Sequence, residues 1–298
     1  MTTAVLERLA SAPISWGVCE VPGWGIELPI DQVLSEMASL GFKATELGSD
    51  GYLPDDPSDL RRVVESHGLG MIGGFVPVVV HEPSQQDASL EAARRAAALM
   101  AGAGASVFIS AAVTSWDWAP REPVDDRGWD FAATMFAKID QIAADHGMVQ
   151  ALHPHYGTIV ETRADVEQVL DVSDVGFTLD TGHLMMGGCD PLEFVEQHFD
   201  RIRHVHLKDV DMAVAQKVVS GELTLMAGVQ SGMFCNLGIG DVPIDKIVLA
   251  LEHRRYDGWY VVEQDAAITG TEEAAESPLA DVAASVDHLR MLLEGSFS

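Results

Sequence analysis

Short apolar runs alternate with longer amphipathic stretches along the whole chain. The apolar runs predict strands at residues 12–18, 42–48, 69–78, 105–113, 148–155, 175–180, 202–209 and 258–264. The amphipathic stretches predict helices near residues 29–41, 57–68, 86–103, 127–147, 162–172, 191–200, 243–256 and 277–295. Strict alternation of strands and helices predicts an α/β protein with a parallel sheet. Eight such units in about 300 residues favour a single closed (β/α)8 TIM barrel over an open sheet.

No linker or repeat divides the chain, so residues 1–298 are expected to form one TIM-barrel domain. One connection is unusually long. It follows the seventh strand and covers about residues 209–242, and connections of that length usually carry structure or function. Its "MAVAQKVVSGEL" predicts a short helix, and its "SGMFCNLGIG" is rich in glycine. We expect this segment to lie on the catalytic face, as a lid or as a contact between copies in a homo-oligomer.

Composition narrows the partners and the compartment. The formal net charge of −28 disfavours DNA or RNA binding, because nucleic-acid affinity comes largely from Lys and Arg that neutralise phosphates. The cysteines at 19, 189 and 235 are odd in number and widely spaced, which is typical of a reduced, cytoplasmic chain. Glu7 and Arg8 interrupt the stretch where an export signal would need an apolar core.

Residues 96–116 contain no charge and are long enough for a membrane helix, which needs about 20 apolar residues. Glycines and serines interrupt this segment, however. We therefore expect the end of a helix, a turn and a buried strand, and no membrane span.

Polar side chains gather where the predicted strands end, and active sites of TIM barrels lie at the carboxyl ends of their strands. The candidates are Glu46, His153, His155, Asp180, His183, His204, His206, Lys208, Asp209, Glu263 and Asp265. Side chains alternate across a strand, so Asp180 shares a face with Thr178, and His206 shares one with His204 and Lys208. If these faces point inward, Asp180, His206 and Glu263 converge, and His153 can join them.

A mixed set of His, Asp and Glu suits a divalent metal, and the absence of thiolate argues against a soft-metal site. Each residue also has a simpler interpretation. A histidine at a strand end can be structural, Asp180 can cap the next turn, and His183 can bind loop backbone. Lys208 and Asp209 can form a solvated pair, and His204 can belong to the core. Agreement in parity between four strand ends favours the metal site.

Several stretches together resemble the inosose dehydratase family of the xylose isomerase-like barrels. They are "APISWG" and "VPGWG" near the start, "GFKATELGSDGYLP", "HPHYGTIVET", "DTGHLMMGGCDP", "HFDRIRHVHLKDV", "SGMFCNLGIGDVP" and "YDGWYVVEQD". The resemblance covers most of residues 12–267. It implies a metal site made of His153, Asp180, His206 and Glu263. Where epimerases of this superfamily carry a glutamate before proline, this chain carries His153, which disfavours an epimerase that moves a proton between two glutamates.

The resemblance implies a cytoplasmic hydro-lyase of inositol catabolism. It would dehydrate a cyclic polyol ketone, scyllo-inosose, to a dione through an enolate. The expected ion is Mn²⁺ or Co²⁺, with Mg²⁺ and Zn²⁺ as alternatives, and its Lewis acidity would stabilise the enolate. His155 is the first candidate for one acid/base role, and Glu46 or Glu263 for the other.

Lys208, His183 and Trp16 are expected to contact the substrate. Three alternatives stay open at this point: an isomerase or epimerase of keto sugars, a lyase subunit that cleaves 3-keto-C-glycosides, and a sugar-binding barrel without turnover.

Overall fold

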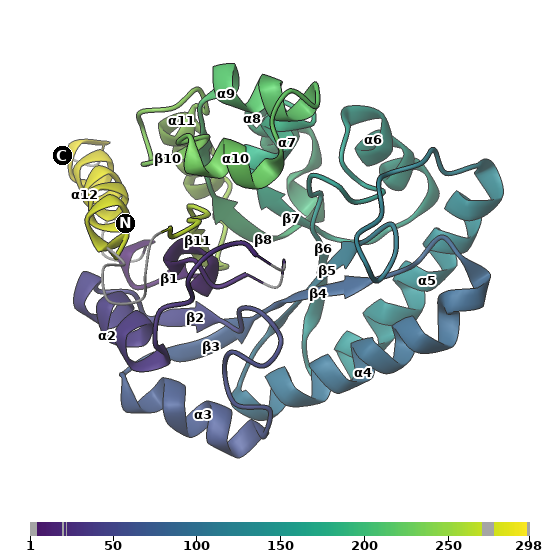
Figure 1. The fold of residues 1–298 in the computed structure, drawn as a ribbon, viewed down its shortest axis with the longest axis horizontal. Coiled ribbons are helices and arrows are strands. Elements are labelled where there is room, and N and C mark those ends of the chain that lie inside the picture. Colours follow the sequence, from purple (N-terminus) through teal and green to yellow (C-terminus); the bar gives the residue numbers. More distant parts are fainter. Residues whose placement is uncertain (1–4, 20, 22, 270–276, 297–298) are drawn as a thin grey trace.

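Parallel strands form a barrel at the centre of the molecule, and helices surround it (Figure 1). The computed structural model describes residues 5–19, 21, 23–269 and 277–296. Within these ranges the barrel strands are β1 (Leu9–Ser11), β2 (Ala44–Glu46), β3 (Gly70–Gly73), β4 (Phe75–Val78), β5 (Val107–Ala112), β6 (Val149–Leu152), β7 (Phe177–Asp180), β8 (Ile202–Leu207) and β11 (Tyr260–Val262).

The sheet closes into a barrel at one strand segment, which a glycine divides into two halves. Its order is β3-β2-β1-β11-β8-β7-β6-β5-β4, and neighbouring strands pair in parallel. The two ends of this order, β3 and β4, are halves of one chain segment interrupted at Gly74. A Cβ at Gly74 would lie 2.7 Å from the Cβ of Leu47, so only glycine lets the strand pass from one neighbour to the other. The strand predicted at 69–78 therefore pairs in two segments, and the predicted barrel is confirmed.

Outer helices follow the strands as the pattern predicted. They are α2 (Ile30–Leu40), α3 (Pro57–Ser66), α4 (Gln86–Ala103), α5 (Asp126–Asp145), α6 (Arg163–Val172), α8 (Pro191–His198), α11 (Ile244–His253) and α12 (Leu279–Ser296). Local capping sets several of their starts. The side chain of Thr162 accepts from the backbone N–H of Asp165, whose carboxylate in turn accepts from the N–H of Thr162. Shorter helices are η1 (Pro13–Trp16), η2 (Pro83–Gln85), α7 (Thr181–Met186) and η3 (Phe199–Arg201).

The first strand lies earlier than its pattern predicted. The prediction of a strand over 12–18 is wrong: β1 ends at Ser11, and Pro13 begins the 3-10 helix η1. Proline lacks a backbone N–H and has a φ suited to the first position of a helix, so it ends the strand and starts η1. The short β1 still completes the barrel, because Ala10 pairs with both Val261 and Ala44.

The predicted alternation across the strands is confirmed by the two sides of the barrel wall. One buried cluster inside the barrel consists of the small or branched residues Ala10, Ala12, Ala44, Ile72 and Val261. The alternate residues Phe177, Leu179, Val205, Tyr260 and Val262 belong instead to the large cluster shared with the helices. Asp180, His206 and Glu263 continue the inner rows, so their side chains point toward the barrel mouth.

The long connection after β8, residues 209–242, is folded and will be called the insertion. It contains β9 (Asp209–Val210), α9 (Met212–Val219), α10 (Leu225–Gln230) and β10 (Phe234–Cys235), and β9 pairs with β10 in antiparallel fashion. The predicted short helix is confirmed as α9. In Figure 1 the insertion lies beside α7, above the ends of β7 and β8.

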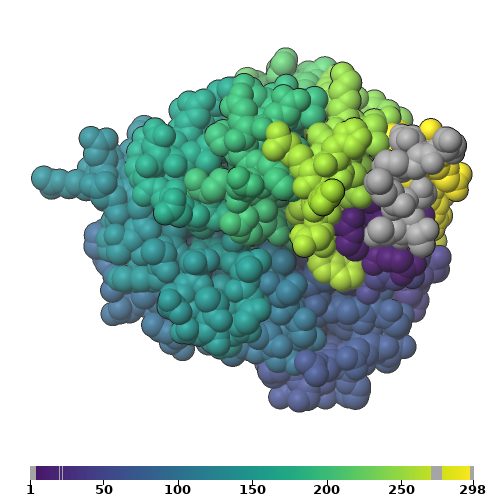
Figure 2. Space-filling model, turned by 180° about the vertical axis from the view of Figure 1, so that it is seen from behind, coloured from purple at the N-terminus to yellow at the C-terminus, as the bar shows by residue number. Residues whose placement is uncertain are grey.

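The first and last barrel strands along the chain, β1 and β11, are neighbours in the sheet. Seen from behind, purple residues near the N-terminus lie next to a yellow-green segment from late in the chain (Figure 2). The segment 96–116 contains the end of α4 and all of β5, as predicted. In the part of the chain that the structure describes, no helix is both long and apolar enough to cross a membrane.

Candidate metal and active site

Ligand-type side chains from five parts of the barrel meet at the carboxyl ends of the strands. Glu46 ends β2, Asp180 ends β7 and His206 lies near the end of β8. His153 directly follows β6, and Glu263 directly follows β11. Each of these residues is at most 6% exposed. Parallel strands bring their carboxyl ends to one edge, which explains why residues so far apart in sequence are neighbours here.

The ligand atoms of His153, Asp180 and His206 lie close enough to one another to hold one ion, and Glu263 Oε2 lies beside His206. His153 Nε2 lies 3.3 Å from His206 Nδ1 and 3.4 Å from Asp180 Oδ2. His206 Nδ1 lies 3.6 Å from Asp180 Oδ2 and 3.2 Å from Glu263 Oε2. Ligand atoms about 2.1 Å from a common ion are separated by roughly 3.0–3.4 Å, so these spacings suit one shared cation.

The Asp180 carboxylate divides its two oxygens between two tasks. Oδ1 accepts from the backbone N–H of His183 at 2.8 Å and caps α7, so the simpler interpretation of Asp180 also holds. Oδ2 is buried and has no hydrogen-bond partner among the described residues. A buried carboxylate oxygen without a donor is costly. A cation between the histidines and Glu263 would satisfy it, so the donor set fits a divalent metal.

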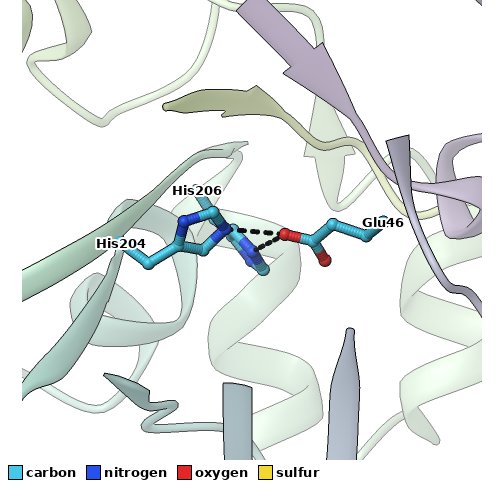
Figure 3. A group of neighbouring side chains, drawn as sticks. All are labelled: Glu46, His204 and His206. Carbon is cyan, nitrogen blue, oxygen red and sulfur yellow. Dashed lines mark hydrogen bonds and ion pairs between the residues drawn. The ribbon is translucent and has the colours of Figure 1, made fainter. Parts of the chain in front are cut away.

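The Glu46 carboxylate contacts both His204 and His206 (Figure 3). Its Oε1 lies 2.9 Å from His206 Nε2 and 2.7 Å from His204 Nε2. These atoms could also hold a metal as a group of three. The distances are those of hydrogen bonds from two N–H groups to one carboxylate, however, and leave the group satisfied without an ion. A hydrogen on His206 Nε2 leaves the lone pair on Nδ1, which faces Asp180 and Glu263.

Electrostatics favour negative charge on Glu46 and positive charge around His206. Burial alone would raise the pKa of Glu46, but His206 and the hydrogen bonds from His204 and His206 outweigh burial and hold that pKa well below its usual range. Burial opposes a charge on His206 as well, yet Glu263 and Glu46 raise its pKa well above the ordinary value. The surrounding carboxylates thus favour positive charge at this position, as a cation site requires.

Lys208 is a buried cation at the edge of the ligand set. Its Nζ lies 2.6 Å from Glu263 Oε1, 2.7 Å from Asp265 Oδ1 and 3.6 Å from Asp180 Oδ2. Burial disfavours the charge, but Asp180, Asp265 and Glu263 together raise the pKa of Lys208 well above its usual value. Lys208 therefore stays protonated, and it can donate hydrogen bonds but cannot serve as a base. The simpler prediction of a solvated pair between Lys208 and Asp209 is wrong, because both side chains are at most 1% exposed.

The residues after Asp180 hold Lys208 in place. Thr181 Oγ1 donates to the carbonyl oxygen of Lys208 at 2.7 Å and accepts from its backbone N–H at 2.9 Å. A Cβ at Gly182 would lie 2.8 Å from Cγ of Lys208, so glycine leaves the space that the lysine stem occupies. His183 Nε2 lies 3.4 Å from Lys208 Nζ.

His155 and His183 lie beside the ligands with ring centroids 3.9 Å apart. His155 Nδ1 is 2.7 Å from the carbonyl oxygen of Tyr156. Since a carbonyl only accepts, Nδ1 carries the hydrogen and Nε2 keeps the lone pair. Burial, His153 and Lys208 lower the pKa of His155 to about 3. The ring is therefore neutral near pH 7, with a lone pair on Nε2, but so low a pKa makes it a weak base.

Aromatic rings border the histidines. The Phe75 ring centroid lies 5.7 Å from His153 and 5.5 Å from His155, and the Trp118 ring is stacked on Phe75 at 6.2 Å. On the other side, the Phe234 ring of the insertion lies 4.7 Å from Lys208 Nζ. These aromatic residues supply apolar surface next to a charged centre.

The structure places one predicted residue away from this group. Trp16 is fully buried in the large core cluster, and its Nε1 donates to Glu36 on α2 at 2.8 Å. His183 lies in the site and also accepts from the backbone N–H of Tyr156 at 3.4 Å, so its predicted loop contact is present too. His204 is buried, as expected of a core residue.

Sequence reasoning gave no role to Asp265, Phe234, Phe75 or Trp118. Asp265 follows Glu263 with the same parity, which was a usable signal. Phe234, Phe75 and Trp118 reach the site through loop conformations or across the barrel, and no local sequence pattern predicts such contacts.

Comparisons with known proteins agree with this fold. Residues 34–290 match the family model described as the xylose isomerase-like TIM barrel. An inosose dehydratase of Geobacillus kaustophilus is 33% identical over 275 residues, covering 88% of this chain and 89% of that protein. The rhizopine catabolism protein MocC of Rhizobium meliloti is also 33% identical, covering 87% of this chain and 81% of that protein.

Among solved structures, the IOLI protein with a bound zinc atom superposes with a TM-score of 0.71 at 15% identity. The match covers 98% of this chain and 99% of that one, and it supports the fold alone. The matched barrel model and the inosose dehydratase relatives at 32–33% identity over most of their length establish that the chain belongs to the xylose isomerase-like TIM barrels and, among them, to the inosose dehydratase family.

Proposed function

We propose that this chain is a divalent-metal-dependent hydro-lyase that dehydrates an inosose, a cyclic polyol ketone, to a dione. Membership of the inosose dehydratase family supports the reaction and the substrate class. The observation that carries the metal dependence is the buried Asp180 Oδ2, which has no hydrogen bond among the described residues and lies 3.4 Å from His153, 3.6 Å from His206 and 3.6 Å from Lys208.

His153, Asp180, His206 and Glu263 would hold the ion. A divalent cation there supplies Lewis acidity that favours negative charge on the ketone oxygen of the substrate. Nitrogen and oxygen donors suit Mn²⁺ or Co²⁺, and Mg²⁺ and Zn²⁺ are alternatives. Glu46 would orient His206 rather than touch substrate. It contacts His206 at Nε2, whereas the other proposed ligands face Nδ1 of that ring, and its second contact is with His204.

The chain's own residues divide the proton transfers. His155 Nε2 carries a free lone pair and accepts the proton from the carbon next to the ketone, and the electron pair moves onto the ketone oxygen. The hydroxyl on the following carbon then receives a proton and leaves as water. Glu263 is the other acid/base candidate, because its Oε1 lies 2.6 Å from the Lys208 ammonium, which donates to it.

Lys208 fixes the substrate by donating to one of its oxygens, and it stabilises negative charge that develops there. Its charge is permanent because three carboxylates raise its pKa. His183 lies 3.4 Å from Lys208 Nζ, its ring centroid is 3.9 Å from that of His155, and it would contact the same part of the substrate.

The test is turnover. The purified chain is supplied with scyllo-inosose and Mn²⁺ or Co²⁺, and the ultraviolet absorbance of the dione is followed. Absence of the dione absorbance with each of several metals would refute the assignment of inosose as the substrate. Exchange of substrate protons with solvent without loss of water would indicate an epimerase or isomerase instead. Turnover of a 3-keto-glycoside would indicate a glycoside-cleaving lyase.

Two further expectations complete the proposal. The small-molecule substrate and the reduced cysteines fit an enzyme of the cytoplasm. Association into a homo-oligomer would be measured by analytical ultracentrifugation, and the exposed side of the insertion is where we expect the contact.

A further inference from the structure

One buried carboxylate anchors the insertion to the barrel. Asp209 is fully buried at the start of β9, directly after Lys208. Within the described chain, its Oδ1 accepts from the backbone N–H groups of Val210 at 2.9 Å and Val242 at 3.1 Å. Its Oδ2 accepts from those of Gly238 at 2.8 Å and Gly240 at 3.0 Å. One side chain therefore ties the first residues of the insertion to its last.

Glycine is required where the backbone approaches this carboxylate. A Cβ at Gly240 would lie 2.3 Å from Asp209 Oδ1, and Gly238 has a φ of +88°. The C-terminal helix α12 closes the turn from outside, because the backbone N–H of Leu237 donates to Ser285 Oγ at 3.0 Å. The glycine-rich turn is thus held by Asp209 on one side and by Ser285 of α12 on the other, in a conformation that requires its glycines.

The anchored segment delivers one side chain to the site. Phe234 pairs with Val210 across the β9–β10 ladder, next to the Cys235–Asp209 pair. The Phe234 ring lies over Lys208 Nζ at 4.7 Å and meets the His183 ring edge-on at 5.5 Å. An aromatic face so close to an ammonium group favours its position electrostatically and excludes water from it.

We propose that Asp209 is a positioning residue that acts through Phe234: it fixes the insertion against the barrel, and thereby sets the place of the Lys208 ammonium and of the His183 ring. This inference rests on the proposed function only for its kinetic consequence. The physical step, from carboxylate to turn to aromatic ring, stands on the hydrogen bonds and ring contacts alone.

Asp209→Asn isolates the carboxylate with almost no change in shape. Asparagine has one acceptor oxygen and one NH₂ group, so two of the buried backbone N–H groups lose their acceptor and face a donor instead. The matched control is Asp211→Asn, two residues along. Asp211 caps α9 by accepting from Ala213 and Val214, and asparagine caps a helix as well as aspartate does.

Kinetics give the first arm of the test. With scyllo-inosose, Asp209→Asn is expected to lower kcat/KM by about tenfold or more, and Asp211→Asn by less than about twofold. If Asp209 acts through Phe234, adding Asp209→Asn to Phe234→Ala changes kcat/KM by no more than about twofold. Two independent losses that multiply in the double variant would overturn the proposal and leave Asp209 a merely structural residue.

Hydrogen exchange gives an arm that needs no substrate, so it still decides if the wild type fails to turn over inosose. Asp209→Asn is expected to speed exchange at Gly238, Gly240 and Val242 and also in the peptide that holds Phe234, by about tenfold or more. Phe234→Ala should speed exchange only around its own strand pair. Unchanged exchange in folded Asp209→Asn protein refutes the proposal. If that variant does not fold, Gly240→Ala, which crowds the carboxylate, is measured in its place with the same expected pattern.

Discussion

Replacing Glu46 by Gln tests whether this carboxylate orients a metal ligand. Glu46 Oε1 accepts from His206 Nε2 at 2.9 Å and from His204 Nε2 at 2.7 Å, and the side chain is 3% exposed. Gln keeps an acceptor oxygen at this position and removes the negative charge. The histidine tautomers can therefore persist, while the electrostatic support of His206 is lost.

The expected size follows from the contact with His206. A hydrogen bond to a charged acceptor is worth about 1.5–3 kcal/mol, and a neutral one about 0.5–1.5 kcal/mol. Only the bond to His206 is coupled to the ligand nitrogen, so the loss in metal-binding free energy should be the difference between the two, about 1–1.5 kcal/mol. That corresponds to a roughly 5- to 13-fold higher Kd, near the lower end of the usual range for a residue that supports a metal-binding histidine.

The assay is isothermal titration calorimetry of metal-free protein with Mn²⁺ or Co²⁺. Glu252→Gln is the matched control, since Glu252 is also a largely buried carboxylate, bonded to Arg8 and Tyr260 at the opposite end of the barrel. The control should lose stability but keep the wild-type Kd. A Glu46→Gln variant with wild-type Kd and a lowered kcat would refute the positioning argument and return Glu46 to the catalytic role predicted from the sequence.

Four further substitutions or treatments test the rest of the site. Asp180→Asn keeps the Oδ1 cap on His183 but removes the Oδ2 ligand, so metal content measured by mass spectrometry should fall to background, whereas retained metal contradicts the ligand set. Lys208→Met should lower kcat about 10²-fold or more, because it removes a donor that stabilises negative charge on the substrate. It should not weaken metal binding, because it also removes a cation that competes with the metal for the carboxylates. Weaker metal binding in this variant would contradict this role. Gly182→Ala should cost about 10- to 100-fold in kcat/KM with metal content intact, since its Cβ would lie 2.8 Å from the lysine stem, and unchanged kinetics contradict the packing argument. Burial and the carboxylates of the insertion raise the pKa of Cys235 to about 12. Iodoacetamide should therefore label this thiol in the folded chain at pH 8 far more slowly than a free cysteine, and labelling should accelerate as the pH rises toward 12. Rapid labelling at pH 8 would contradict that environment.

Periodicity predicted the barrel and much of its mouth because both depend on local rules. Strand and helix alternation predicted the closed sheet, and parity predicted that Asp180, His206 and Glu263 point inward. His153 was reached by the same logic, since it continues the inner row of β6 past Ala151. These inferences succeed because neighbouring parallel strands end at one edge, whatever the details of their loops.

Contacts that cross the barrel or pass through folded loops could not be predicted in this way. Glu46 meets His204 and His206 only because β2 and β8 face each other across the lumen, and no spacing in the sequence encodes that distance. Phe234 reaches Lys208 through the insertion, whose path depends on the anchoring of a glycine-rich turn. The position of β1 was missed because an apolar run was given more weight than Pro13 within it.

The stretch "LDTGH" works together with the strand beside it. β7 and β8 are neighbours in register, with Asp180 opposite His206, so the residues that follow Asp180 must meet those that follow His206. Asp180 supplies the ligand oxygen, and Thr181 then fixes the backbone of Lys208, while Gly182 makes room for its stem. The metal site and the lysine are therefore held by different residues of one turn. It follows that changes at positions 181 and 182 should act on substrate binding and turnover, whereas changes at 180 should act on the metal, although these positions are adjacent in sequence.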